Sequence, residues 1–573
     1  MAEIAQAVRT EEVMEGELDR PTSWGWTGLI LALLVAGADF GLNYGINNQN
    51  VYLLAGLRAL RPDLLSHDWL ASQTYLIHPV FSALIPMLAR IGPLPLLTVL
   101  LNVLIVSGSL LAFRTVFRGF DARSATAATL LLATAFVAQR TRSVGVTYLF
   151  NNFLQPSSFA VCGMLLAIVC FLHGRYLVSG ILLALGAAFH DSYLVLGIMV
   201  FGLVHLTLGK EGLIRRGLMQ LLPAGLVLLK ELPVLLTVAK DPQREASFYI
   251  FEQIRAPHHH YPLSFLGDYL HYIAWMLLAL AAASAPEARQ NPILRRLWRL
   301  QVVLVGLLAV STLLTTVVFI PQVSMLFLTR TAPFSVLLSE VVVIHAILAK
   351  FTGRPAELAA HWPPWRNWLW GVGLSLPLVR AALHQPTADD LVLPLLLLVG
   401  TLVYLGWRRS AQSVTPSDTA GNRFAGWLAG LVLAAFLVVS LSQSTLIHGL
   451  GTPAERELYA WARTTDPASV FVIPPDMEDF RLQSERAIVV DWKASPVLAS
   501  EILEWYRRIG RISGDSAVGG LDQAIGGYAK LTPAALASLS RDYGANYAVF
   551  RTPRADTSGV VYRNHDFVVL GLR

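Results

Sequence analysis

The stretch that decides the fold is Pro93–Arg123, PLPLLTVLLNVLIVSGSLLAFRTVFRGFDAR, in which a long apolar run ends in Arg114, Arg118 and Arg123. An apolar run of about 20 residues is long enough to cross the hydrocarbon core of a bilayer as a helix. Arginines at the end of such a run resist translocation and stay on the cytoplasmic side. The stretch therefore predicts a membrane span with a cytoplasmic basic end.

Comparable apolar runs recur from Trp24 to Ser440, and we predict about 13 membrane spans there. Nearly every second gap between the runs is basic, while Arg140 and Arg142 fall in an outer gap against this rule. With the N-terminus inside, an odd number of crossings places the C-terminal segment outside. The cytoplasmic gaps then hold the following cations: Lys210, Arg215, Arg216, Arg289, Arg295, Arg296, Arg299, Lys350, Arg354, Arg366, Arg408, Arg409 and Arg423.

The composition excludes most other classes of protein. Hydrophobic residues make up 54% of the chain and charged residues 14%, which excludes a soluble multi-domain protein. The formal charge of +6 comes from the basic gaps, and no basic-aromatic stretch supports a nucleic-acid partner. Cys162 and Cys170 lie in one apolar run, so neither a disulfide framework nor a cysteine metal site is expected.

The chain divides into three predicted regions, of which the first two are a cytoplasmic tail at 1–23 and a transmembrane domain at 24–445. A long outer loop, about 42–92, follows the first span. Within it, Val51–Leu60 and Trp69–Ile91 carry apolar residues at helical spacing, interrupted by polar ones. Such segments predict helices that lie along the membrane interface. The alternative is that Tyr75–Ile91, within the second segment, forms a short span or half-span.

The third region, 446–573, has a different character and is predicted to be a small extracytoplasmic α/β domain. Short β-prone runs alternate with helical patterns over this segment, as in small α/β folds. The predicted fold class is thus a mainly α, polytopic membrane protein with a small C-terminal α/β domain. Helices are expected at 453–463, 498–509 and 533–543, and strands at 470–473, 487–490, 547–550, 560–562 and 567–570.

Two cations inside apolar runs are the first candidates for a binding site. Lys230 and Arg330 both lie near the outer ends of their predicted spans, roughly 10–12 Å below the outer surface at about 1.5 Å per residue. Under a loop that carries His258 and His259, such a pair suits an anionic lipid headgroup such as a phosphate. The alternative is that Lys230 pairs with an acid elsewhere and that Arg330 snorkels or bonds backbone carbonyls.

Two carboxylates are candidates for catalysis. Asp39 ends the first span, in Ala-Asp39-Phe-Gly, and Asp68 stands in the outer loop, in Ser-His67-Asp68-Trp. Either one could accept a proton from a hydroxyl acceptor or help to hold a divalent cation such as Mg²⁺ or Mn²⁺. The alternative role for Asp68 is to cap the helix that follows it.

Further polar residues gather on the predicted outer side. They are His67, the pair His190-Asp191 at the end of a span, and Arg255 in Arg255-Ala-Pro-His-His-His-Tyr-Pro262. Neutral imidazoles bind metals and make hydrogen bonds well, but consecutive histidines cannot all ligate one ion from regular structure. We therefore predict no zinc site there, and a solvated loop is the alternative for the run.

The C-terminal segment carries many charges close to a short predicted strand. They could bind an acceptor, or they could form a salt-linked face that docks on the outer loops. The charges concerned are Arg481, Arg486, Asp491, Lys493, Glu504 and Arg507.

The predicted architecture resembles that of the GT-C superfamily of integral membrane glycosyltransferases. Members of that superfamily have a cytoplasmic N-terminus, a long first outer loop with interfacial helices, many spans and often an outer C-terminal domain. The resemblance implies transfer of a sugar from a polyprenyl-phosphate-linked donor at the outer leaflet. It also implies a catalytic base at Asp39 or Asp68. The acidic pairs usual in that superfamily are absent, because Phe40 follows Asp39 and Trp69 follows Asp68.

Local motifs are also similar to an uncharacterised bacterial family with GT-C-like architecture, which implies the inner membrane of a bacterium; they include Gln155-Pro156-Ser-Ser-Phe-Ala and Phe189-His190-Asp191. Two functions stay open. One is a lipid-linked-sugar transferase. The other, favoured by the missing acidic pairs, is a non-catalytic scaffold or accessory subunit of a larger membrane complex, with protein partners on the C-terminal domain. A transporter would require repeat symmetry, and none is visible.

Overall fold

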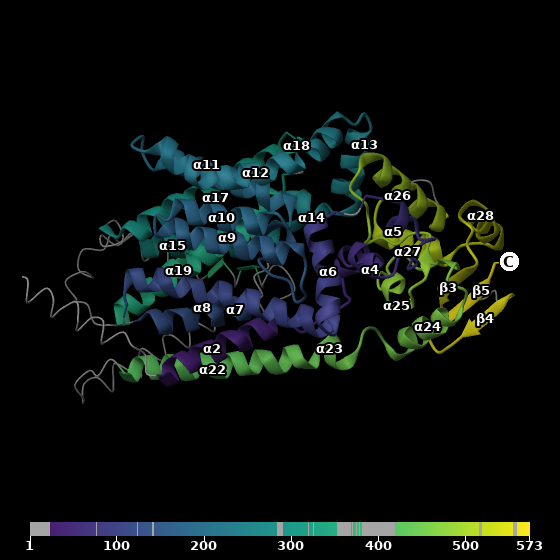
Figure 1. Ribbon diagram of the computed structural model, residues 1–573, viewed down its shortest axis with the longest axis horizontal. Helices are drawn as coiled ribbons and strands as arrows, with labels where there is room; N and C mark the ends of the chain where they lie inside the picture. Colours follow the sequence, from purple (N-terminus) through teal and green to yellow (C-terminus); the bar gives the residue numbers. More distant parts are fainter. Residues whose placement is uncertain are drawn as a thin grey trace, which may run out of the picture.

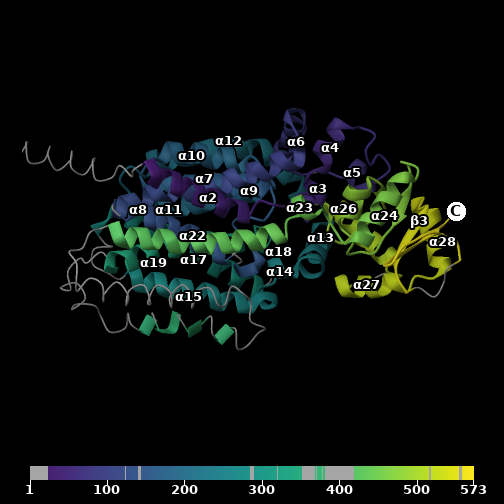
Figure 2. The ribbon, with the colours of Figure 1, turned by 90° about the horizontal axis from the view of Figure 1, so that it is seen from below.

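The computed structural model shows an elongated helical bundle with a mixed α/β domain at one end (Figure 1, Figure 2). The N-terminal tail predicted at 1–23, apart from Ser23, and the span predicted at 391–407 lie outside the described residues. The described residues are 23–75, 77–122, 124–139, 143–283, 290–318, 320–324, 326–351, 419–514, 518–553 and 558–572, with short pieces between 368 and 380.

The long helices of the bundle are apolar over most of their length. They are α2 (Ser23–Asp39), α7 (Leu94–Phe120), α8 (Ala125–Gln139), α9 (Pro156–Leu172), α10 (Tyr176–Ala187), α11 (Asp191–Thr207), α12 (Leu213–Lys240), α15 (Leu266–Ala283), α17 (Pro292–Thr316), α19 (Thr331–Phe351) and α22 (Thr419–Ser442). Helices α2 and α22 lie side by side along one edge of the bundle, although the whole transmembrane sequence separates them (Figure 1, Figure 2).

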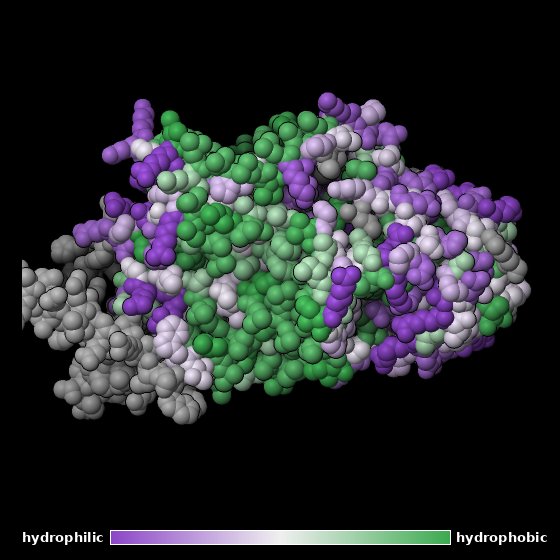
Figure 3. All heavy atoms as spheres, in the orientation of Figure 1, coloured by the Kyte–Doolittle hydropathy of each residue, from purple (hydrophilic) through white to green (hydrophobic). Residues whose placement is uncertain are grey.

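Within the described part of the chain, five segments are long and apolar enough to cross a membrane: Leu94–Phe120, Pro262–Ala283, Pro292–Thr316, Leu328–Leu348 and Leu433–Thr464. Shorter apolar helices lie between them. A broad hydrophobic band covers the bundle, with hydrophilic surface at both ends (Figure 3). The prediction of a multi-pass membrane protein is therefore confirmed, whereas the predicted count of about 13 spans is not established.

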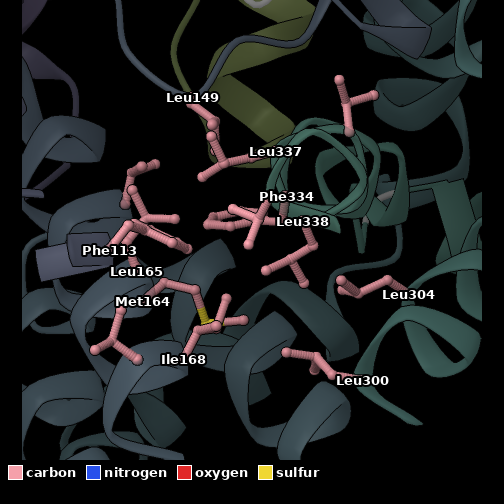
Figure 4. Close-up of a cluster of buried hydrophobic side chains, with 14 of the residues drawn as sticks. Phe113, Leu149, Met164, Leu165, Ile168, Leu300, Leu304, Phe334, Leu337 and Leu338 are labelled. Atoms are coloured by element: carbon pink, nitrogen blue, oxygen red, sulfur yellow. The ribbon is translucent and has the colours of Figure 1, made fainter. Parts of the chain in front are cut away.

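Close packing of side chains joins the helices of the bundle. Lipid tails are as apolar as leucine, so helices in a membrane associate through tight contact and small residues. Gly163 of α9 and Gly186 of α10 face each other so closely that a Cβ on Gly163 would lie 2.6 Å from the Cα of Gly186. Nearby, Phe113, Ile168 and Phe334 belong to one buried cluster contributed by α7, α9, α17 and α19 (Figure 4).

The first outer loop forms short helices, as predicted, but with an additional break. They are α3 (Gln49–Tyr52), α4 (Leu54–Leu60), α5 (Trp69–Gln73) and α6 (Pro79–Ile91). The single helical segment expected at Trp69–Ile91 is therefore two helices. His78 precedes Pro79, whose ring disfavours the α conformation in the residue before it. His78 adopts φ 65°, and the chain turns there before α6 begins.

The C-terminal segment forms a three-layer α/β domain, which confirms the predicted sheet. The strands lie in the order β2-β1-β3-β5-β4; β1 is parallel to β2 and β3, and β5 is antiparallel to β3 and β4. The elements are α24 (Pro453–Thr464), β1 (Val470–Val472), α25 (Phe480–Ser484), β2 (Ala487–Ile488), α26 (Ala499–Ile512), α27 (Leu521–Ala529), α28 (Pro533–Tyr543), β3 (Tyr547–Arg551), β4 (Val560–Arg563) and β5 (Phe567–Gly571).

Alternation along the strands gives the sheet two buried faces. In β3, Val549 packs with Leu458 and Phe480 of α24 and α25 on one face. Its neighbour Phe550 packs with Trp505 of α26 on the other face, together with α27 and α28. Because successive side chains of a strand point to opposite faces, one strand can serve both hydrophobic layers.

A buried ion triad fixes the α/β domain to the first outer loop. Asp68 caps α5, since its Oδ1 accepts from the Ala71 N–H at 2.9 Å, and its Oδ2 accepts from Arg481 Nε at 2.9 Å. Arg481 Nη1 in turn donates to Asp491 Oδ2 at 2.7 Å. All three side chains are at most 2% exposed. The charges of the C-terminal segment thus include a salt-linked contact with the outer loop.

Several polar contacts surround this triad and align the two parts. Asn50 of α3 donates to Asp479 at 2.6 Å, and Arg61 pairs with Glu485 at 2.7 Å. The backbone N–H of Tyr75 donates to Glu501 at 2.8 Å. The α/β domain therefore rests on the whole length of the first outer loop.

We expect Arg481→Met to destabilise the folded protein strongly. The substitution leaves two buried carboxylates without their counter-charge, and breaking such a buried pair costs about 3–5 kcal/mol. Thermal unfolding followed by tryptophan fluorescence measures the loss, because Trp505 donates to the Asp491 carbonyl at 2.9 Å. Arg507→Met is the matched control. Its ion pair with Glu504 is solvent-exposed, so its loss costs about 1 kcal/mol or less. Equal unfolding temperatures for both variants would contradict the role of the triad.

Candidate functional site

The polar site of the molecule centres on Arg330, where the bundle meets the α/β domain. Arg330 ends the short helix η4 (Leu328–Arg330), directly before α19. Its guanidinium lies over the rings of Tyr193 and Phe327, at 5.0 and 4.5 Å from the ring centroids. Its Nη1 atom is shielded from solvent and makes no hydrogen bond with any described residue. A half-buried cation whose nitrogen lacks a partner is suited to an anionic ligand.

Aromatic and imidazole rings from separate elements surround this guanidinium. The ring of Tyr52, from α3, lies 5.0 Å from that of His78, and His78 lies 4.4 Å from His190. His190 lies 5.3 Å from Tyr193, which completes the path to Arg330. We call Arg330, Tyr52, His78, His190, Tyr193 and Phe327 the Arg330 cluster.

The histidines at this site are neutral. Burial lowers the pKa of His78 and of His260 to about 3, and the nearby charge of Arg330 lowers both further. Burial also lowers the pKa of His190 and of His259 well below the ordinary value. Because a depressed histidine pKa leaves the ring uncharged at neutral pH, these four rings add no positive charge to the site. Arg330 therefore provides the positive charge of its cluster.

The consecutive histidines form the short helix α14 (Pro257–His260), which packs beside the cluster. His259 Nδ1 lies 2.8 Å from the Gly145 carbonyl, in the turn η1 (Val144–Val146). His260 Nδ1 lies 3.3 Å from the Ser324 carbonyl, at the end of α18 (Pro321–Ser324). The His258 ring lies 4.1 Å from that of His259. The run predicted as a possible solvated loop is thus packed against the bundle.

Three of the six non-glycine residues with a left-handed backbone in the described part of the chain lie at the same place. His78 has φ 65°, and Val146 and Phe327 each have φ 51°. Such conformations cost about 1–3 kcal/mol in bulky residues and persist where the surroundings enforce them, typically at ligand sites. Each of these three residues lies in the Arg330 cluster or beside a residue that contacts α14. The backbone evidence therefore indicates the same site as the unpartnered cation.

Arg255 lies at the seam between this site and the α/β domain. Its Nη2 donates to the Lys493 carbonyl at 2.7 Å, and its Nε is shielded and has no partner among the described residues. Burial raises the pKa of Tyr52, an effect that the charges of Arg330 and Arg255 oppose. The charges of both guanidinium groups therefore act on Tyr52.

The other predicted phosphate ligand, Lys230, lies elsewhere. Its side chain is 59% exposed on α12, and its Nζ lies 3.4 Å from Glu231 Oε1. No described contact joins Lys230 to Arg330. Asp191 lies within electrostatic range of Lys230 and Glu231 rather than in the cluster. His67 is exposed on the turn before α5. Of the outer-face residues singled out in the sequence, the structure thus brings together His190, Arg255, His258, His259 and Arg330.

The two candidate carboxylates have different surroundings. Asp39 ends α2 and accepts a hydrogen bond from the Ser440 hydroxyl of α22, and 8% of the residue is exposed. Asp68 is fully buried, and its Oδ2 accepts from the Ile488 N–H at 3.0 Å in addition to Arg481. In the part of the chain that the structure describes, no group of three or more His, Cys, Asp or Glu residues is placed to hold a metal ion.

Sequence reasoning assigned no role to several residues of the site. Tyr52, His78 and Tyr193 were not among the predicted site residues. The His-Pro dipeptide at 78–79 was the available signal, because a histidine before proline is pushed out of the helical conformation. Phe327 carries no comparable signal, since its left-handed φ depends on tertiary packing.

Comparisons with known proteins address the fold. A family model described as a domain of unknown function, DUF6798, matches residues 453–512, which run from α24 through α26. No curated protein matches the sequence. ArnT from Cupriavidus metallidurans in the apo state is similar at a TM-score of 0.51 and 15% identity, covering 96% of this chain and 99% of that one. This chain therefore has the fold of that ArnT structure.

Two further solved structures are similar at lower scores. The apo oligosaccharyltransferase of Archaeoglobus fulgidus has a TM-score of 0.49 and 11% identity, covering 93% of this chain and 70% of that one. ArnT from Cupriavidus metallidurans bound to undecaprenyl phosphate has a TM-score of 0.48 and 15% identity, covering 96% and 99%. The similarity to the apo ArnT structure spans both the helical bundle and the α/β domain, because nearly the whole chain is covered.

Proposed function

We propose that the protein is a GT-C-type membrane glycosyltransferase that takes a sugar from a polyprenyl-phosphate-linked donor at the outer leaflet, with Arg330 binding the donor phosphate. The observation that carries this proposal is the shielded, unpartnered Nη1 of Arg330 among neutral rings. A buried cation without a counter-charge is costly, and an anionic ligand removes that cost. Guanidinium also matches the geometry of phosphate oxygens through parallel hydrogen bonds.

The position of the Arg330 cluster supports a lipid donor. Arg330 directly precedes α19 and lies at the start of the apolar segment Leu328–Leu348. A phosphate bound there would sit at the end of the apolar band, next to the α/β domain, while its polyprenyl chain extends along the hydrophobic surface of the bundle (Figure 3). A water-soluble sugar nucleotide would gain nothing from this placement.

Asp39 is the carboxylate that we assign as the catalytic base. It ends α2 on the side of the first outer loop, and a hydrogen bond from Ser440 orients its Oδ1. In the proposed reaction the acceptor hydroxyl gives its proton to Asp39 and attacks the anomeric carbon, and the lipid phosphate leaves with the electrons of the broken bond. Asp68 is assigned the structural role of holding Arg481, since its fully buried carboxylate accepts three hydrogen bonds from protein groups.

The α/β domain is proposed to lie outside the cytoplasm, in the inner membrane of a bacterium. The pattern of basic gaps in the sequence supports this orientation, and a gap that the structure describes lies at the opposite end of the bundle. There Arg296 of α17 donates to the Leu172 carbonyl at 2.8 Å, and Asn291 donates to the Gly119 carbonyl at 3.0 Å. Positive charge at this end marks the cytoplasmic side. The N-terminus then lies in the cytoplasm.

A non-catalytic scaffold is the second candidate function. It is favoured by the sequestration of Asp68, which removes one of the two carboxylates that the GT-C resemblance offers as a base. In that case the α/β domain would bind a protein partner. The two functions differ in whether Asp39 is required for turnover.

We expect Arg330→Met to weaken binding of undecaprenyl phosphate by about 10- to 100-fold, since a hydrogen bond to a charged group contributes about 1.5–3 kcal/mol. Undecaprenyl phosphate is the lipid of the ArnT complex described above. Native mass spectrometry of the purified protein measures the affinity. Arg330→Lys should restore part of it, because the charge remains but the bidentate geometry is lost. Lys230→Met tests the other cation that the sequence predicts as a phosphate ligand. A loss in Lys230→Met with full binding by Arg330→Met would place the phosphate elsewhere.

The Asp39→Asn variant distinguishes between the two proposed functions, enzyme and scaffold. In membranes of a deletion strain that carry the restored protein, we expect turnover of labelled undecaprenyl-phosphate hexose to fall about 10²- to 10⁴-fold, because general-base catalysis supplies acceleration of that order. Binding of undecaprenyl phosphate and the unfolding temperature should stay as in the native protein. Asn differs from Asp by one atom and keeps an acceptor for Ser440. If Asp39→Asn turns over the donor as fast as the native protein does, the result supports the scaffold. The same holds if the native protein itself shows no turnover.

A further inference from the structure

A second polar arrangement, which the proposed reaction leaves unused, lies beside the Arg330 cluster. Glu252, on the π-helical turn η2 (Ile250–Arg255), is fully buried, and so, within a few per cent, are Ser324 and His260. The Glu252 carboxyl faces the Ser324 hydroxyl, although neither carboxyl oxygen reaches a hydrogen bond of good geometry in the described part of the chain. Ser324 Oγ lies 3.0 Å from His260 Nδ1. The three residues therefore form a continuous row.

The contacts of Ser324 determine the tautomer of His260. His260 Nδ1 lies within hydrogen-bond distance of the Ser324 carbonyl, at 3.3 Å, as well as of its hydroxyl. The hydroxyl can either donate or accept, whereas a carbonyl oxygen only accepts, so we assign the proton to Nδ1 on the basis of the carbonyl contact. The neutral ring then has an unprotonated Nε2, which can only accept a hydrogen bond. This atom is shielded and has no partner among the described residues.

The neutral ring of His259 has the same tautomer, for the same reason. Its Nδ1 lies 2.8 Å from the Gly145 carbonyl, which again assigns the proton to Nδ1 and leaves Nε2 as an acceptor. Two neighbouring neutral histidines therefore offer acceptor nitrogens at this site. Acceptor nitrogens repel the oxyanions of a phosphate and attract hydroxyl groups.

Phe327 links this row to the Arg330 cluster. Its ring lies 4.4 Å from that of His260 and 4.5 Å from the Arg330 guanidinium, and its backbone is left-handed. The unpartnered Nε2 of His260 and the unpartnered Nη1 of Arg330 therefore flank one strained aromatic residue. A ligand that satisfies both atoms must carry an anionic group and, next to it, a hydroxyl donor.

We propose that His260, positioned by Ser324 and Glu252, accepts a hydrogen bond from a hydroxyl group next to the bound phosphate and so selects a sugar-bearing lipid phosphate over the bare lipid phosphate. This inference rests on the proposed function, because Arg330 supplies the anion contact. His260 determines specificity by touching the ligand. Ser324 and Glu252 are positioning residues that act through His260.

The protonation state of Glu252 is compatible with this role. Burial raises its pKa to about 8, so the group is a neutral carboxylic acid at neutral pH. A neutral acid adds no negative charge beside a phosphate site. It also means that Gln, which is neutral and of the same shape, can replace Glu252 without loss of the row, whereas Ala cannot.

The test compares two probes on the purified full-length protein in nanodiscs: undecaprenyl phosphate, and undecaprenyl phosphate carrying one glucose. We expect His260→Phe to lower the affinity for the glucose-bearing lipid about 10-fold and to leave that for undecaprenyl phosphate unchanged, because the loss of one hydrogen bond to the ligand has an effect of this order. Ser324→Ala and Glu252→Ala should show a smaller loss of the same selectivity, and Glu252→Gln should bind both lipids as the native protein does. His565→Phe, at a histidine whose side chain is 94% exposed, is the control.

The outcomes separate this inference from the proposed function. If Arg330→Met weakens binding of both lipids and His260→Phe changes neither, or changes both equally, the inference is wrong and the phosphate site stands. If Arg330→Met changes neither lipid, the proposed function fails. Should His260→Phe not fold, the comparison of Ser324→Ala with Glu252→Gln decides: equal selectivity in these two variants would overturn the positioning row.

Discussion

The buried triad Asp68–Arg481–Asp491 is the interaction on which the rest of the structure depends. A buried ion pair adds little net stability, because desolvation offsets the attraction, but it tolerates no misplacement of its members. Arg481 therefore fixes the α/β domain relative to the first outer loop at one defined position. That loop supplies Tyr52 and His78 to the Arg330 cluster, and the same domain supplies the Lys493 carbonyl that holds Arg255. The site exists because the two parts are locked together.

Charged and neutral side chains have different roles at the site. Burial keeps the surrounding histidines neutral, so that a single guanidinium supplies the positive charge of the Arg330 cluster. Neutral rings add hydrogen-bonding and stacking surfaces without competing for an anion. The left-handed backbone at His78 and Phe327 places these rings against Arg330, and the stability of the packed bundle offsets that strain. An anion and its neutral polar substituent can therefore be bound by separate groups.

The sequence predicts those features that depend on local chemistry or on periodicity. Basic gaps and apolar runs predict the membrane bundle, and β-prone runs predict the five-stranded sheet. The capping role considered for Asp68 is also local and is observed. Its ion pair is not predictable, because Arg481 lies 413 residues away in the chain. The rise per residue predicts how deep a residue lies in the membrane. It does not predict in which direction around the helix axis its side chain points. Lys230 and Arg330 therefore have similar predicted depths, yet Lys230 is exposed on α12.

The most direct test of the central claim is an electron cryo-microscopy structure of the full-length protein in nanodiscs with added undecaprenyl phosphate. The account predicts phosphate density within hydrogen-bond distance of the Arg330 guanidinium, with the polyprenyl chain along the apolar band and the Asp68–Arg481–Asp491 triad unchanged. Phosphate density at another position, with the Nη1 atom of Arg330 still unpartnered, would contradict it.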